Sequence, residues 1–257
     1  MIALLISALL LLGPLAAPTA QAAANTGNHS STPAEEYQAL AKEHQAAMEE
    51  FGNAYQRAKT DAEREKVAAK YPQPAKSAPR FLALARKNPK DPAAIDALVW
   101  VAVNSRSGAE FDEAMKLLAA DYFGSDKLGQ VCQSLVYSSS PESEKFLRLV
   151  LEKNPSKDVK GLACLSLGQL LKRQSGNEGR SGSEAEKLFE QVVAKYGDGS
   201  TGRGSLADAA KAELFELRNL GIGKTAPEIE GEDVDGKKFK LSDYRGKVVV
   251  LDFWGDW

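Results

Sequence analysis

The stretch GKTAPEIEGEDVDGKKFKLSDYRGKVVVLDFWGDW, residues 223–257, decides the fold of the C-terminal part of the chain. Asp235-Gly236 within it is a strong hairpin signal, because glycine tolerates the positive φ that a tight turn demands. The run Val248–Leu251 is continuous and mostly β-branched, which is typical of a strand buried on both faces. Before that run, Ile229, Val234 and Phe239 are isolated by acidic and turn residues. The stretch therefore predicts an extended, sheet-forming segment.

These residues resemble the start of the thioredoxin-like domains of the alkyl hydroperoxide reductase and thiol-specific antioxidant type. Three separate pieces agree in order and spacing: GKTAPEI at 223–229, DGK at 235–237 and LSDYRGKVVVLDFWGDW at 241–257. The likeness is greatest to the exported thiol-disulfide oxidoreductases of that group. It covers about 35 of 257 residues. The resemblance implies an α/β domain that exchanges disulfides and uses no cofactor.

The resemblance also implies site residues. In such domains the tryptophan matched by Trp257 is followed at once by a Cys-x-x-Cys pair at a helix N-terminus, which stabilises the attacking thiolate. The chain stops one residue before that pair, so we expect it to be catalytically incomplete, with no catalytic or cofactor-binding residue of its own. Asp252 matches the acid that is buried beneath the pair in some thioredoxins, and Trp254 and Trp257 would flank the missing cysteines. The alternative roles of these three residues are a capped strand end and aromatic packing.

The two cysteines of the chain, Cys132 and Cys164, each lie in an apolar, helix-patterned stretch. A disulfide needs Cα atoms about 4.4 to 6.8 Å apart, whereas packed helix axes lie about 8 to 10 Å apart. The sequence therefore favours two buried free thiols over a disulfide, and over a redox role. His29 and His44 have no second ligand at metal spacing, so we expect no metal site.

Upstream of the quoted stretch the pattern is helical. Thr32-Pro33-Ala34-Glu35 predicts a helix start, with Thr32 as N-cap, Pro33 at the first helical position and Glu35 completing a capping box. The helix-patterned stretch continues to Lys70, and the Tyr71-Pro72-Gln73-Pro74 segment ends it.

Four pairs of helical segments follow, with starting points near residues 81, 114, 146 and 188, which are steps of about 33, 32 and 42 residues. The motif Lys-Asn-Pro occurs at 87–89 and again at 153–155. Gly and Ser clusters at 174–182 and 197–205 are predicted loops. The fold class is therefore mainly α: a helical-hairpin array like an α-solenoid, weakly similar to tetratricopeptide-type repeats, followed by the incomplete β start of a thioredoxin-like domain. The alternative is an irregular helical domain with accidental periodicity.

The N-terminus has the outline of an export signal, with an apolar run from Ile2 to Leu12 and small residues that suit cleavage after Ala22 or Ala24. A run of about 11 residues is shorter than the roughly 20 that cross a membrane, so no stable span is expected. The predicted organisation is a signal peptide at 1–24, a linker at 25–32, a helical domain at 33–220 and a truncated thioredoxin-like domain at 221–257. The mature protein would be periplasmic or extracellular.

Two functions remain open at this point. The first is the N-terminal part of an exported thioredoxin-like thiol-disulfide oxidoreductase, whose substrates are protein or small-molecule disulfides or peroxides. The second is a non-catalytic helical-repeat scaffold that binds a protein partner and carries a degenerate thioredoxin-like tail. The balance of 33 basic and 35 acidic residues argues against nucleic acid as a partner. Because the short strands lack covering helices, we expect weak order after Gly221 unless this tail docks on the helices.

Overall fold

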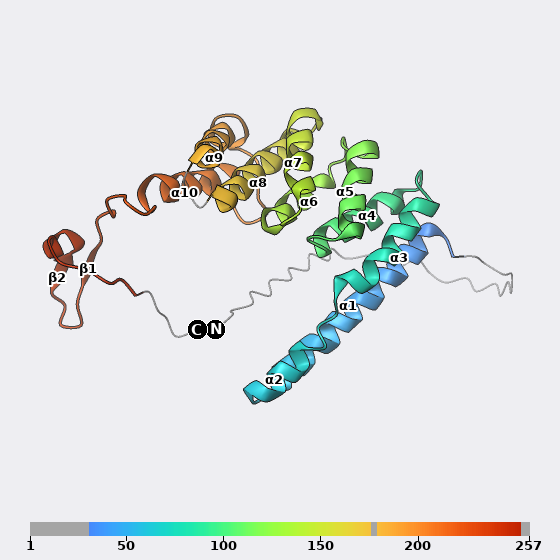
Figure 1. The fold of residues 1–257 in the computed structure, drawn as a ribbon, viewed down its shortest axis with the longest axis horizontal. Helices are drawn as coiled ribbons and strands as arrows, with labels where there is room; N and C mark the ends of the chain where they lie inside the picture. The colour runs from blue at the N-terminus through green and yellow to red at the C-terminus, as the bar shows by residue number, and fades with distance from the viewer. Residues whose placement is uncertain (1–30, 176–178, 253–257) are drawn as a thin grey trace, which may run out of the picture. The chain divides into compact units, whose positions relative to one another are not determined.

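The computed structural model describes residues 31–175 and 179–252. Within them the chain is mainly helical, and two short strands follow the helices (Figure 1). The predicted fold class is thereby confirmed at the level of a mainly α chain with a small β element. The expected signal peptide, most of the expected linker and His29 lie outside the described residues. Among the residues described, no helix is both long and apolar enough to cross a membrane.

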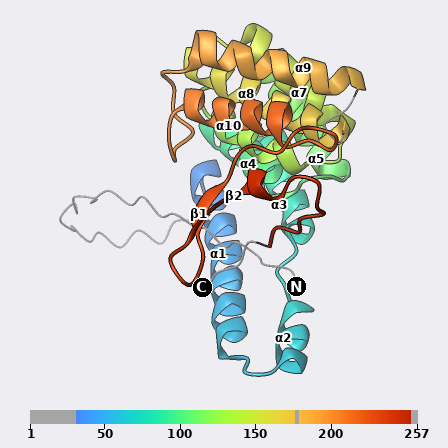
Figure 2. The ribbon, with the colours of Figure 1, turned by 90° about the vertical axis from the view of Figure 1, so that its left-hand side faces the viewer.

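Helix α1 (Pro33–Arg57) starts where the sequence predicts. The Thr32 hydroxyl accepts a hydrogen bond from the Glu35 backbone N–H at 3.3 Å, and the Glu35 carboxylate accepts one from the Thr32 N–H at 2.8 Å. The stretch does not continue unbroken to Lys70, because a second helix, α2 (Asp61–Ala68), begins at a second capping box formed by Thr60 and Glu63. The pattern Thr60-x-x-Glu63 is the signal that the sequence analysis missed. Figure 2 shows α2 folding back along α1.

The next eight helices follow as the four expected pairs. Their bounds are α3 (Pro74–Lys87), α4 (Pro92–Asn104), α5 (Ala109–Asp121), α6 (Leu128–Ser134), α7 (Pro141–Lys153), α8 (Lys157–Ser175), α9 (Gly179–Gln191) and α10 (Leu206–Asn219). A short 3₁₀ turn, η1 (Leu135–Tyr137), extends α6, and a π-helical turn, η2 (Val192–Tyr196), extends α9. Odd-numbered helices pack on one another (α3 on α5, α5 on α7), as do even-numbered ones (α4 on α6, α6 on α8, α8 on α10). Assignment of these pairs to a repeat class stays a prediction.

The core is one cluster of buried side chains that extends from α1 to α10, because neighbouring helices share their apolar stripes; α2 contributes no buried residue to it. Large side chains with essentially no exposed surface come from every helix from α3 to α9, among them Phe81, Phe111, Leu167 and Phe189. Glycine sets the spacing at one contact: a Cβ on Gly168 of α8 would lie only 2.6 Å from the ring of Phe189. The close approach of α8 and α9 therefore depends on the missing side chain at position 168.

The two predicted loops have different outcomes. The prediction for 174–182 is wrong at both ends, because α8 extends to Ser175 and α9 already begins at Gly179. The prediction for 197–205 is confirmed. There Gly202 and Gly204 adopt φ values of +83° and +155°, and Ser200 pairs with Ser205 in an isolated β-bridge.

The two Lys-Asn-Pro motifs also differ. Asn88 donates from its side-chain amide to the carbonyl of Leu84 in its own helix, at 3.0 Å. Asn154 is completely buried, and its amide reaches a different loop, where it donates to the carbonyls of Phe123 at 2.8 Å and Ser125 at 3.1 Å. The same Lys-Asn-Pro motif therefore has two roles. Its asparagine caps the end of α3 at position 88, and at position 154 it joins the loop after α7 to the loop after α5.

The C-terminal segment begins after α10. Strands β1 (Glu230–Glu232) and β2 (Lys238–Lys240) pair antiparallel, with Gly231 opposite Phe239, and a 3₁₀ turn, η3 (Leu241–Tyr244), follows. The predicted strand at Val248–Leu251 is not formed in the described residues, and those side chains are exposed. The predicted strand is therefore wrong for the described structure. A β-branched run forms a central strand when another strand pairs with it and another element covers it, whereas the hairpin contacts mainly itself and η3. The domain division near residue 221 stays a prediction.

Candidate functional site

The hairpin turn is built by one aspartate and one glycine. Gly236 has a φ of +76°, the left-handed conformation that the Asp235-Gly236 signal predicted. The Asp233 carboxylate accepts hydrogen bonds from the backbone N–H groups of Asp235 at 3.0 Å and Lys237 at 2.9 Å. The turn is thus specified locally, which confirms the predicted hairpin.

Residues before and after the hairpin are joined. The Leu241 N–H donates to the Ile229 carbonyl at 2.9 Å, and the Ser242 N–H donates to the Glu228 carboxylate at 2.9 Å. Hydrogen bonds from the side chain and backbone of Ser242 lower the pKa of Glu228. The segment from 228 to 244 therefore forms one small hydrogen-bonded motif.

Beyond this motif the apolar run lies open to solvent. Val248 is 97% exposed and Val250 is 87% exposed, and Val249 and Leu251 are also exposed. A row of exposed β-branched residues is unusual on a protein surface, because contiguous apolar patches of soluble proteins are commonly interaction sites. Asp252 is exposed in this structure, so its expected role as a buried acid stays a prediction. Trp254 and Trp257 lie outside the described residues.

The two thiols have no access to substrate. Cys132 and Cys164 are both free and buried, as the sequence predicted, and the Cys164 Sγ lies 3.4 Å from the Leu188 carbonyl as a hydrogen-bond donor. Burial raises the pKa of each thiol to about 12. A thiol with such a pKa is almost wholly protonated at neutral pH and is a poor nucleophile. These cysteines fill space between helices.

His44 is half-buried, and its ring meets the ring of Trp100 edge-on with centroids 5.0 Å apart. Burial lowers the pKa of His44. This is a packing role, not a ligand position. Over residues 31–175 and 179–252, no group of three or more His, Cys, Asp or Glu side chains is arranged to hold a metal ion.

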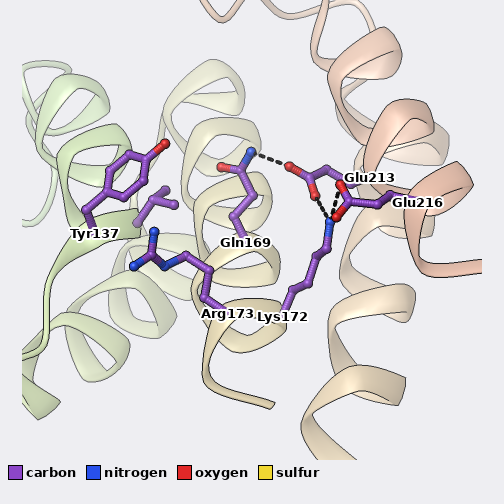
Figure 3. Close-up of a pocket in the computed structure, with 7 residues that line it drawn as sticks. Tyr137, Gln169, Lys172, Arg173, Glu213 and Glu216 are labelled. Atoms are coloured by element: carbon purple, nitrogen blue, oxygen red, sulfur yellow. Dashed lines mark hydrogen bonds and ion pairs between the residues drawn. The ribbon is translucent and has the colours of Figure 1, made fainter. Parts of the chain in front are cut away.

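A second constellation lies in the helical region, between η1, α8 and α10. It surrounds an open pocket of about 390 Å³. The side chains that line it are drawn in Figure 3: Val136, Tyr137, Gln169, Lys172, Arg173, Glu213 and Glu216. Gln169 lies between Tyr137 on one side and Glu213 on the other (Figure 3).

One wall of this pocket is a fixed ionic network. The Lys172 ammonium lies 2.8 Å from Glu213 and 2.7 Å from Glu216, and the Gln169 amide donates to Glu213 at 2.8 Å. Burial alone would lower the pKa of Lys172, but its hydrogen bonds to Glu213 and Glu216 outweigh this and raise it. Lys172 therefore stays charged at neutral pH and holds α8 to α10.

The opposite wall is aromatic and cationic. The Tyr137 side chain is 60% exposed, and two guanidinium groups approach its ring. The Arg173 Cζ lies 4.7 Å from the ring centroid and the Arg106 Cζ lies 5.7 Å from it, both within the range of a cation–π contact.

Sequence analysis did not find this pocket, because its walls combine residues far apart in the sequence: Tyr137 and Arg173 on one side, Glu213 and Glu216 on the other. The only local signal is the Lys172-Arg173 pair that ends an apolar helix. Such a pair is common at helix C-termini, where basic residues complement the helix dipole.

Comparisons with known proteins place similarity at the C-terminus. The AhpC/TSA family matches residues 222–257. The thiol-disulfide oxidoreductase ResA of Geobacillus thermodenitrificans (strain NG80-2) is 47% identical over 42 residues, which are 16% of this chain and 24% of that protein. ResA of Geobacillus kaustophilus (strain HTA426) is 50% identical over 42 residues, with the same coverage of 16% and 24%. ResA of Bacillus anthracis is 36% identical over 74 residues, which are 27% of this chain and 38% of that protein.

The chain thus spans between a quarter and two fifths of the length of these curated relatives. No solved structure matches the chain. The resemblance predicted from residues 223–257 is confirmed as a similarity to the AhpC/TSA family and to ResA proteins, and it is confined to the C-terminal part, which follows a helical region.

Proposed function

We propose that this protein is an exported thiol-disulfide oxidoreductase of the thioredoxin-like type, in which the helical region precedes a redox domain that begins near residue 222. The observation that carries the proposal is the match of residues 222–257 to the AhpC/TSA family. The hairpin supports the proposal, because its turn contains Asp235-Gly236, which belongs to the stretch that resembles this family.

The chemistry of such a domain is a dithiol–disulfide exchange. One protein thiolate attacks a substrate disulfide, so that a mixed disulfide forms and one substrate thiolate leaves. A second protein thiolate then attacks the mixed disulfide, releases the other substrate thiolate and completes a protein disulfide. Two electrons pass from the protein to the substrate, and the protein must afterwards be reduced by another dithiol.

This exchange needs two accessible thiols close together, and Cys132 and Cys164 do not meet that requirement. They lie in α6 and α8, are buried, and have pKa values raised to about 12. The proposal therefore places the reacting pair after Trp257, in sequence that would continue the domain. The exposed run Val248–Leu251 supports this, because it has the composition of a central strand and needs further strands and helices to cover it.

The test begins with the nucleotides that follow the codon of Trp257. The proposal expects an open frame that encodes Cys-x-x-Cys, and a stop codon at that point in the genome would refute it. The protein from the full frame should reduce insulin, and changing either cysteine of that pair to serine should abolish the reaction. As a matched control, the double variant Cys132→Ala, Cys164→Ala should keep its rate; loss of activity in a control that circular dichroism shows to be folded would assign the chemistry to the helical region instead.

Export is part of the same proposal. It is supported by the apolar run Ile2–Leu12 and the small residues that follow it. N-terminal sequencing of protein isolated from the natural host should find a chain that begins at Ala23 or Asn25. A chain that retains Met1 and stays in the cytoplasm would remove export from the proposal and leave the redox chemistry standing.

A second candidate function is that the helical region is a scaffold for a protein partner. The observation that favours it is the Tyr137 pocket, which the proposed redox chemistry does not use. Both functions can coexist in one protein, because the pocket and the hairpin are made by different parts of the chain.

A further inference from the structure

We infer that the pocket between η1, α8 and α10 is a peptide-binding site that takes a carboxylate group against Tyr137, Arg106 and Arg173. This inference goes beyond the redox function and does not depend on it. Three observations support it: Arg106 and Arg173 share the Tyr137 ring, the pocket also offers an amide oxygen and apolar surface, and its two walls carry opposite charge.

Arg106 and Arg173 differ from the ion-paired arginines of the helical region. Arg80, Arg86, Arg148 and Arg218 each pair with a glutamate of a neighbouring helix. In the part of the chain that the structure describes, Arg106 and Arg173 instead contact the Tyr137 ring and form no ion pair. Arg57 and Arg203 also form no ion pair in the described residues, but only Arg106 and Arg173 share one exposed aromatic ring there. Two guanidinium groups that share one exposed ring concentrate positive charge and hydrogen-bond donors at one point, and a carboxylate is the group that a guanidinium fork matches best.

The rest of the pocket suits a peptide. The Gln169 amide nitrogen is engaged by Glu213, which leaves the Gln169 carbonyl oxygen as an acceptor toward the pocket (Figure 3). A peptide N–H is the ordinary donor to such an amide oxygen. Val136 and the face of Tyr137 add apolar contact, and exposed tyrosine with arginine is the composition of interface hot spots. The volume of about 390 Å³ accommodates a few residues, not a folded domain.

The wall formed by Lys172, Glu213 and Glu216 determines the orientation of the bound peptide. Glu213 and Glu216 share the single ammonium of Lys172, so this side of the pocket carries an excess of negative charge. A ligand carboxylate is repelled there and attracted at Tyr137, so one orientation of the peptide is favoured over its reverse. Charge complementarity thus identifies the occupant as a peptide segment that bears a carboxylate at one position. An acidic side chain and a free C-terminus offer the same chemistry.

The experiment is a titration of the full ¹⁵N-labelled chain with three short peptides, followed by NMR. The first peptide has one glutamate and an amidated C-terminus; the second has glutamine in place of glutamate and a free C-terminus; the third has glutamine and an amidated C-terminus. We expect saturable shifts of signals from residues 136–137 and 169–173 with one or both of the first two peptides, and none with the third. The peptide that binds identifies the source of the carboxylate.

Variants separate a binding site from general attraction. Arg173→Gln should weaken binding about 10-fold or more, the effect of losing a charge-assisted hydrogen bond. Arg173→Lys keeps the charge and should be intermediate. Arg57→Gln, an exposed arginine in the last turn of α1, makes the same change in net charge and should bind as the parent does. Three results would each overturn the inference: equal shifts with all three peptides, no shift with either of the two peptides that carry a carboxylate, or full affinity in a folded Arg173→Gln protein.

Discussion

The helical region and the C-terminal segment use the same kinds of apolar residue to opposite effect. In the helices, residues such as Phe111 and Leu167 lose essentially all contact with water, because each stripe meets a neighbouring helix. In the segment after residue 221, Val248 and Val250 keep nearly all of their exposed surface. Composition is therefore a poor guide to burial. A helix brings its own backbone hydrogen bonds and needs only a packed face, whereas a strand needs a partner for its backbone as well.

The largest expected difference between the two regions is in amide hydrogen exchange. Amides in the middle of α3, α4 and α8 should exchange only through global unfolding, which for domains of this kind slows exchange by about 10⁴-fold or more. Amides of Val248–Leu251 should exchange close to the rate of an unfolded peptide. Mass spectrometry of peptic fragments measures both at once. Strong protection of residues 248–251 would show that this segment has found a partner within the chain, and the comparison would fail.

Truncation of one large side chain in each region sharpens the comparison. Phe111→Ala removes a completely buried ring from the core of α5 and should lower the free energy of unfolding by about 3 to 5 kcal/mol. Val250→Ala acts on an exposed side chain and should change it by less than about 0.5 kcal/mol. Urea denaturation followed by circular dichroism measures the two values. A cost for Val250→Ala near that of Phe111→Ala would mean that the exposed run is buried in solution.

Two glycine substitutions test how tightly the helices pack. An alanine at Gly168 would place its Cβ 2.6 Å from the ring of Phe189, so Gly168→Ala should cost about 1 to 3 kcal/mol through overpacking of α8 against α9. At Gly52 in α1, no heavy atom lies within 4 Å of the added Cβ. Gly52→Ala should therefore stabilise the protein by about 0.5 to 1 kcal/mol, because alanine is the better helix former. Thermal denaturation distinguishes them, and effects of the same sign would contradict the close approach at Gly168.

The smallest predicted effect is a pH dependence that belongs to the helical region alone. Burial lowers the pKa of His44 in the folded state below the ordinary value for histidine, about 6.5. The unfolded chain then binds a proton more readily, so His44 destabilises the fold as the pH falls below about 6.5 and has no such effect above it. His44→Gln should flatten the fall in Tm between neutral and mildly acidic pH by a small amount, since His44 is only partly buried. An unchanged slope would show that other groups carry it.

How far the sequence could predict the structure depended on how local each signal is. The capping box at Thr32 and the turn at Asp235-Gly236 involve neighbouring residues, and the structure confirms both. The separate start of α2 was predictable from Thr60 and Glu63, although the good helix formers around them concealed it. The exposed run Val248–Leu251 was misread as a formed strand because its composition says nothing of whether a partner is present.

The Tyr137 pocket could not be predicted in this way. Its chemistry arises only when η1, α8 and α10 come together, and no short-range pattern records that Lys172 lies between Glu213 and Glu216. The sequence around Arg106 and Arg173 did not indicate a binding site either. Arg106 and Arg173 differ from the paired arginines of the other helices only in what surrounds them in three dimensions.

The different roles of Asn88 and Asn154 bear on how such a chain could be re-engineered. Judged by sequence alone the two Lys-Asn-Pro motifs look exchangeable, which invites the replacement of one helical hairpin by the other. A transplanted hairpin would contain the same Lys-Asn-Pro motif, but the carbonyls of Phe123 and Ser125 would lose the side-chain amide that donates to both. Each helical hairpin is therefore adapted to the loops and helices that it contacts, and the shared motif does not make the hairpins interchangeable.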